Sequence, residues 1–150
     1  MSNLKLPKWQ IKIIVEMYSL ANRHGTVGDV ACLVDLMARA CPGIPEVIAA
    51  QARIMMCQRD YVGARDLLLA SEARHPTNAV LKALLSFCLF NLRDSTWESY
   101  AHDTLALPTD DIAQAIIDTL AALSNKPLHG SRAEPVSRSD SFVMPMGLAC

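Results

Sequence analysis

Residues 81–90, LKALLSFCLF, are apolar almost all the way around a helix, and the polar residues NLRD follow at once. The segment is shorter than the roughly 18 apolar residues that a membrane-spanning helix requires. A helix that is hydrophobic all round is normally buried among other parts of the protein. The sequence therefore predicts a helical protein in which this segment has neighbouring helices on both sides.

Apolar residues recur at helical spacing along most of the chain, and no stretch alternates with period two for long enough to predict a sheet. Pro42, Pro76 and Pro108 separate the helical patterns, and Thr26 with Asp29 and Ser95 with Glu98 fit the capping-box pattern. We expect an all-α protein of about seven helices, at residues 8–23, 27–40, 45–58, 61–74, 78–92, 96–106 and 110–124.

The spacing of the prolines indicates a repeat. Pro42 and Pro76 are separated by the tetratricopeptide period of roughly 34 residues. In that register Ala64 takes the small position where two helices cross closely, and Leu68 takes the bulky apolar position that follows. The flanking repeats match less well. The pattern predicts a tetratricopeptide-like stack of antiparallel helix hairpins over residues 1–125.

Residues 126–150 are rich in proline, serine and glycine and lack helical spacing, which predicts a disordered tail. The alternative is that the apolar end of this tail, FVMPMGLAC, docks on a protein surface.

Composition and charge narrow the function classes. The formal net charge is -1 without blocks of like charge, which argues against nucleic acid or an anionic membrane as partner. No signal peptide is evident in residues 1–20, and no apolar run elsewhere is long enough to cross a bilayer. The five cysteines form no C-x-x-C pair. We therefore expect free thiols and a soluble, cytoplasmic protein.

Catalytic and cofactor motifs are not evident. The histidines are spread along the chain, His24 and His75 near predicted helix ends, and no glycine-rich phosphate loop or calcium-loop pattern occurs. The sequence predicts neither an enzyme nor a bound metal or cofactor. A small enzyme on a helical scaffold is kept only as a contrasting class.

Residues 59–76 and 81–108 give a resemblance to a known family. The string LKALLSFCLFNLRDSTWESYAHDTLALP, preceded by RDYVGARDLLLASEARHP, resembles the HrpK-type accessory family of type III secretion operons in plant-associated bacteria. The resemblance implies a helical protein without catalytic residues that supports assembly of the secretion pilus or needle. It also implies an architecture similar to that of needle-subunit chaperones, whose concave groove holds the subunit's amphipathic helix.

The repeat register places two sets of residues on the helix faces that would line such a groove. We call these two sets the first-helix face; its expected partner-binding residues are Glu46, Ala49, Arg53, Met56, Val80, Ala83, Phe87 and Phe90. The last four form an apolar strip on which an amphipathic helix could bury its own apolar stripe. The alternative is that Phe87 and Phe90 pack against the following helix.

Two functions remain open at this point. One is a chaperone-like protein that binds the pilus or needle subunit, or another component of the apparatus, in the cytoplasm. The other is a structural or tethering component that acts in the periplasm or at the envelope after export without a signal peptide. Such a component could form a homo-oligomer.

Overall fold

The computed structural model describes residues 16, 18, 23–108, 110–126 and 128. Within them, Glu16, Tyr18, Arg23 and His24 are helical, and the rest of the helix expected at 8–23 lies outside the described residues. No strand occurs in this part of the chain, so the all-α prediction is confirmed. The six complete helices are α2 (Val27–Ala40), α3 (Pro45–Cys57), α4 (Tyr61–Glu72), α5 (Ala79–Asn91), α6 (Trp97–Leu105) and α7 (Asp111–Ser124).

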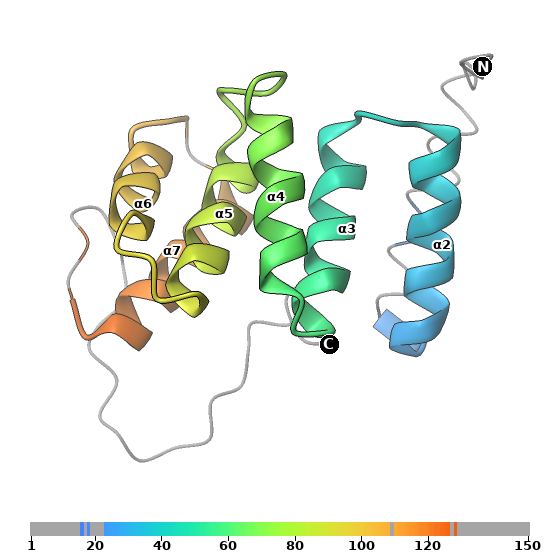
Figure 1. The fold of residues 1–150 in the computed structure, drawn as a ribbon, viewed down its shortest axis with the longest axis horizontal. Helices are drawn as coiled ribbons and strands as arrows, with labels where there is room; N and C mark the ends of the chain where they lie inside the picture. Colours follow the sequence, from blue (N-terminus) through green and yellow to red (C-terminus); the bar gives the residue numbers. More distant parts are fainter. Residues whose placement is uncertain (1–15, 17, 19–22, 109, 127, 129–150) are drawn as a thin grey trace.

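The helices form a stack of hairpins. Consecutive helices from α2 to α6 run in opposite directions and are joined by short loops at alternate ends of the stack (Figure 1). Helix α5 packs against α3, α4, α6 and α7, whereas α2 packs against α3. Because α5 lies next to four helices, it is the central element of the fold.

Side chains at the N-termini fix where several helices begin. The predicted capping box is present, since the Thr26 hydroxyl accepts from the Asp29 backbone N–H and the Asp29 carboxylate accepts from the Thr26 N–H. Asn78 and Asp110 cap α5 and α7 through their side-chain oxygens. The predicted capping box of Ser95 and Glu98 is wrong: α6 begins after Thr96, which makes no side-chain cap.

Helices α3 and α5 end in the same turn. Arg59 and Arg93 have left-handed φ values of 63° and 59°. In the first turn the Asp60 backbone N–H donates to the Met55 carbonyl at 2.9 Å. In the second the Asp94 backbone N–H donates to the Leu89 carbonyl at 3.0 Å. This is the Schellman motif, which satisfies carbonyls that a helix end leaves free. The two turns are one period of roughly 34 residues apart, as the repeat register requires.

The core is built where the register puts small residues beside large ones. Ala52 and Ala64 are fully buried, and Leu68 is 1% exposed. These small side chains let α3 and α4 approach closely, and the main cluster continues through α5 to α7 and to Leu128. A smaller cluster of Val30, Val34 and Ala50 packs under Tyr18 and Ile54 and holds α2 against α3.

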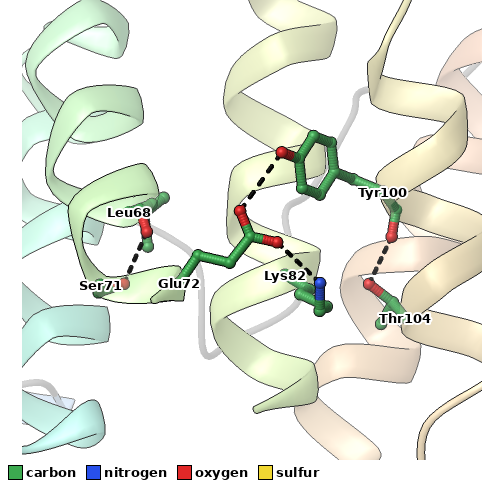
Figure 2. Close-up of polar contacts among 6 residues, drawn as sticks. All are labelled: Leu68, Ser71, Glu72, Lys82, Tyr100 and Thr104. Carbon is green, nitrogen blue, oxygen red and sulfur yellow. Dashed lines mark hydrogen bonds and ion pairs between the residues drawn. The ribbon is translucent and has the colours of Figure 1, made fainter. Parts of the chain in front are cut away.

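A polar network joins three helices beside this core (Figure 2). The Lys82 ammonium on α5 lies 2.9 Å from one carboxylate oxygen of Glu72 on α4, and the Tyr100 hydroxyl on α6 donates to the other at 3.4 Å. Lys82 also lies 5.7 Å from the centre of the Tyr100 ring. The charged side chain of Lys82 on α5 is therefore paired with Glu72 rather than buried without a partner.

Leu128 is buried in the main cluster. The tail expected at residues 126–150 lies mostly outside the described residues, so its disorder stays a prediction. Cys32, Cys41 and Cys88 are free as expected, but the expectation is wrong at Cys57, which is disulfide-bonded.

The close contact between α3 and α4 predicts that Ala64→Leu is destabilising. Ala64 has no exposed surface, so three additional carbons would force neighbouring helices apart, at about 1–3 kcal/mol. Ala70→Leu is the matched control, because Ala70 is exposed on the same helix and should change stability by less than about 0.5 kcal/mol. Urea unfolding of both variants measures the difference, and equal stabilities would contradict the packing described here.

Candidate functional site

The first-helix face is divided between accessible and buried residues on α3. Glu46 is exposed, Ala49 and Arg53 are half-buried, and Met56 is 9% exposed and belongs to the core. The Arg53 guanidinium donates to the Tyr18 hydroxyl at 3.2 Å. The α3 half of the face is therefore polar and in part covered by the segment that precedes α2.

The same division occurs on α5. Val80 and Phe90 are half-buried, whereas Ala83 is fully buried and Phe87 is 7% exposed. The four residues share one side of the helix at spacings of three and four. In this structure they do not form a continuous open strip, because the middle of the strip lies within the core. A role for them in binding stays a prediction.

An open cleft lies at the end of α5, where Phe90 is accessible. Its volume is about 370 Å³, and it is lined by Phe90, Asn91, Arg93, Asp94, Ser95 and Trp97. We call it the Phe90 cleft. Phe90 and Trp97 meet edge to face, with ring centroids 5.3 Å apart and planes at 83°. The expectation that Phe90 packs on the following helix is thus compatible with its facing a cleft.

The Schellman turn after α5 shapes the rim of this cleft. The left-handed conformation of Arg93 reverses the chain and brings α6, with Trp97 at its start, back beside Phe90. Trp97 is 7% exposed, and the Ser86 hydroxyl of α5 donates to its carbonyl oxygen at 2.8 Å. This bond fixes the start of α6 against α5, so the aromatic pair has a defined geometry.

The two charged residues on the rim, Asp94 and Arg93, differ in their interactions. The Asp94 carboxylate accepts from the Thr96 backbone N–H at 3.0 Å and from its hydroxyl at 2.7 Å. The backbone bond first, and then the hydroxyl bond, lowers the pKa of Asp94, which is therefore ionised at neutral pH. Arg93 is exposed and forms no ion pair with any residue that the structure describes. The cleft can thus accept an apolar side chain next to an acidic one.

The sequence pointed to Phe90 but not to the other half of the cleft. Trp97 was expected only as part of the helix at residues 96–106. The sequence did contain a signal: QRD at 58–60 and LRD at 92–94 mark two equivalent turns, and a tryptophan follows only the second.

The residues considered for catalysis do not converge. Among the described residues, no group of three or more histidine, cysteine, aspartate or glutamate side chains could hold a metal ion. His24 and His102 are exposed, and the His75 Nε2 lies 2.8 Å from the Gly43 carbonyl oxygen, which fixes a turn. His129 lies outside the described residues. No helix in the described part combines the length and apolarity needed to cross a membrane.

Comparison with known protein families gives a match. Residues 1–126 match the sequence model of a family described as "Bacterial type III secretion protein (HrpB1_HrpK)". No curated protein and no solved structure matches the chain significantly. The matched range contains every helix described above and the Phe90 cleft.

The cysteine environments predict selective alkylation. Burial raises the pKa of Cys88 to about 12, so at pH 8 this thiol stays protonated as well as inaccessible. Cys32 is exposed on α2 and should react with N-ethylmaleimide within minutes, whereas Cys88 should react only after unfolding in guanidinium. Peptide mass mapping before and after denaturation measures both. Rapid labelling of Cys88 in the folded protein would contradict the burial of α5.

Proposed function

Because this chain belongs to the HrpB1_HrpK family of bacterial type III secretion proteins, we propose that it is an accessory protein that binds a component of the secretion apparatus through the Phe90 cleft. The partner that fits best is the pilus or needle subunit, or another apparatus protein, presenting an amphipathic helix. Binding would shield the apolar stripe of that helix during assembly. The observation that carries the proposal is the open aromatic cleft at the end of an otherwise buried helix.

The cleft supplies the apolar part of the binding. Its volume of about 370 Å³ is within the range of binding pockets, roughly 300–1,000 Å³. Phe90 and Trp97 are fixed by their contact with each other, so they lose little conformational entropy when a partner binds. Burying one leucine-sized side chain there would contribute about 1.5–3 kcal/mol.

The rim supplies orientation. Arg93 has no ion pair with a described residue and stands beside the aromatic pair, where it would meet an acidic side chain next to the partner's apolar anchor. Asp94 would repel the same acidic group if the helix docked in the reverse direction. Exposed charges of this kind mainly affect the association rate and the choice of partner.

The accessible part of the first-helix face would extend the contact away from the cleft. Val80 lies on the same side of α5 as Phe90, and Glu46, Ala49 and Arg53 continue the surface on α3. Met56, Ala83 and Phe87 would support this surface from within the core. An amphipathic helix anchored at Phe90 could therefore lie across α5 and α3, in the helix-in-groove mode.

Two substitutions test the anchor. Phe90→Asp should reduce recovery of the partner at least about tenfold, because a charge would replace the apolar floor of the cleft and such anchors dominate binding energy. Leu69→Asp is the control, because Leu69 is an exposed apolar residue on α4, away from the cleft. The measurement is affinity purification of tagged protein from secreting bacteria, with co-purified proteins quantified by mass spectrometry.

Charge reversal tests the rim without disturbing the core. Arg93→Glu should weaken partner recovery severalfold and make it more sensitive to salt. Arg59→Glu is the matched control, because Arg59 has the same left-handed conformation in the equivalent turn but does not line the cleft. Circular dichroism checks that every variant is folded. Unchanged recovery with folded Phe90→Asp and Arg93→Glu proteins would refute the proposal, and fractionation of the complex shows whether it is soluble or envelope-bound.

A further inference from the structure

Helix α7 keeps large apolar side chains on its surface. It packs against α5 and α6, and against no other of the six complete helices. The side that faces the core is buried and consists of Ala113, Ile116, Ile117, Leu120 and Ala121. Away from that side, Ile112 is 59% exposed and Leu123 is 41% exposed. Ile112 is the most exposed large hydrophobic residue in the part of the chain that the structure describes.

These two residues bound one continuous strip of the helix surface. Ile112 and Leu123 are about three helical turns apart and therefore point to the same side. Between them lie Ala115, Thr119 and Ala122, which are uncharged and half-buried. The Thr119 hydroxyl donates to the Ala115 carbonyl at 2.8 Å, so its hydrogen bond is made within the helix. We call these five residues the α7 face. Its small central side chains would let another helix approach closely between the two large ends.

The absence of charge in the middle distinguishes the α7 face from the exposed apolar residues of α4. There Val62 and Leu69 also share one side of the helix, but Asp66 stands between them. On α7 the nearest acidic residue, Asp118, stands at the edge of the face, where its carboxylate accepts from the Gln114 side-chain amide at 2.9 Å. An apolar surface without a central charge can be buried at a lower desolvation cost.

The two ends of the α7 face carry opposite charges. Asp111 at the N-terminal end is exposed and forms no ion pair with any residue that the structure describes. Lys126 follows the C-terminal end, and its ammonium pairs with Glu98 in an exposed contact. Exposed pairs of this kind contribute little stability, so Lys126 is available to a second acidic group.

This charge distribution is complementary to itself in one orientation. If a second α7 ran antiparallel to the first, Asp111 of each copy would lie next to Lys126 of the other, and Ile112 of each next to Leu123 of the other. The helix dipoles would also be opposed, which is favourable. A parallel arrangement would instead bring each charge next to its like.

We propose that the α7 face binds the same face of a second copy of this chain, with the two α7 helices antiparallel about a two-fold axis. The contact is isologous, so both copies bury the same residues. Two crossing helices form an interface at the small end of the range for specific complexes, and the dimer should therefore dissociate at micromolar concentrations. The face contains none of the residues that line the Phe90 cleft, so this inference does not rest on the proposed function.

Sedimentation velocity of the full chain tests the apolar contact, with concentrations from about 1 to 100 µM to cover a weak dimer. Every protein carries Cys32→Ser, because this exposed thiol could otherwise link two copies. The parent protein should show a monomer–dimer equilibrium. Ile112→Asp combined with Leu123→Asp should raise the dissociation constant at least about tenfold, because two charges would enter the contact. Val62→Asp is the matched control, since Val62 is 49% exposed on α4 and should leave the equilibrium unchanged.

Two results of this experiment would overturn the inference. One is a parent protein that stays monomeric at every concentration. The other is a dimer that the Ile112→Asp and Leu123→Asp substitutions leave intact. Circular dichroism shows that each variant is folded, which is expected because both substituted residues are exposed.

A charge swap tests the orientation at low ionic strength, where exposed charges are least screened. Asp111→Lys and Lys126→Glu should each weaken the dimer about three- to tenfold, because each places like charges together at both ends of the contact. The variant with both substitutions should return to within about threefold of the parent, since every pair is restored with its signs reversed. Single substitutions without effect, or a double variant as weak as the single ones, would overturn the antiparallel arrangement.

Discussion

Helix α5 is covered by α3, α4, α6 and α7, and the rest of the described structure depends on that burial. Seven of its residues in succession, from Ala83 to Leu89, are buried. A helix of this kind has no stable alternative in water, because each exposed large side chain would cost about 1.5–3 kcal/mol. The hairpins on either side therefore stack in the arrangement that covers the middle of α5.

Because the middle of α5 is buried, its polar side chains need hydrogen-bond partners, and neighbouring helices supply them. Ser86 is fully buried, and its hydroxyl donates to the Trp97 carbonyl, which sets the start of α6. Lys82 keeps its charge by pairing with Glu72 and lying near the Tyr100 ring. Among the described residues, no buried side-chain nitrogen or oxygen lacks a hydrogen-bond partner. A shift of α6 along α5 would break these pairs, and an unpaired buried group is expensive.

Helix positions and core contacts could be predicted from local patterns, since prolines, caps and repeat spacing act over a few residues. Ala64 and Leu68 are buried in the core, at the positions that the register assigned to them. The accessibility of the first-helix face could not be predicted in the same way. Phe87 belongs to a core cluster to which helices distant in sequence contribute, and no local pattern encodes this. The cleft was missed because it requires Arg93 to adopt a left-handed conformation that is usual for glycine.

The location of the cleft follows from the same burial. A binding site in the middle of α5 would require the partner to separate packed helices, at the cost of the contacts that hold the fold together. At its C-terminal end the helix leaves the stack, and the Schellman turn exposes Phe90 without exposing the rest. Arg59 closes the equivalent turn on α3, but a glycine, Gly63, stands where Trp97 stands in the next repeat. Repetition thus explains the shape of the turn, and the Phe90–Trp97 ring pair stands at positions that Met56 and Gly63 occupy one repeat earlier.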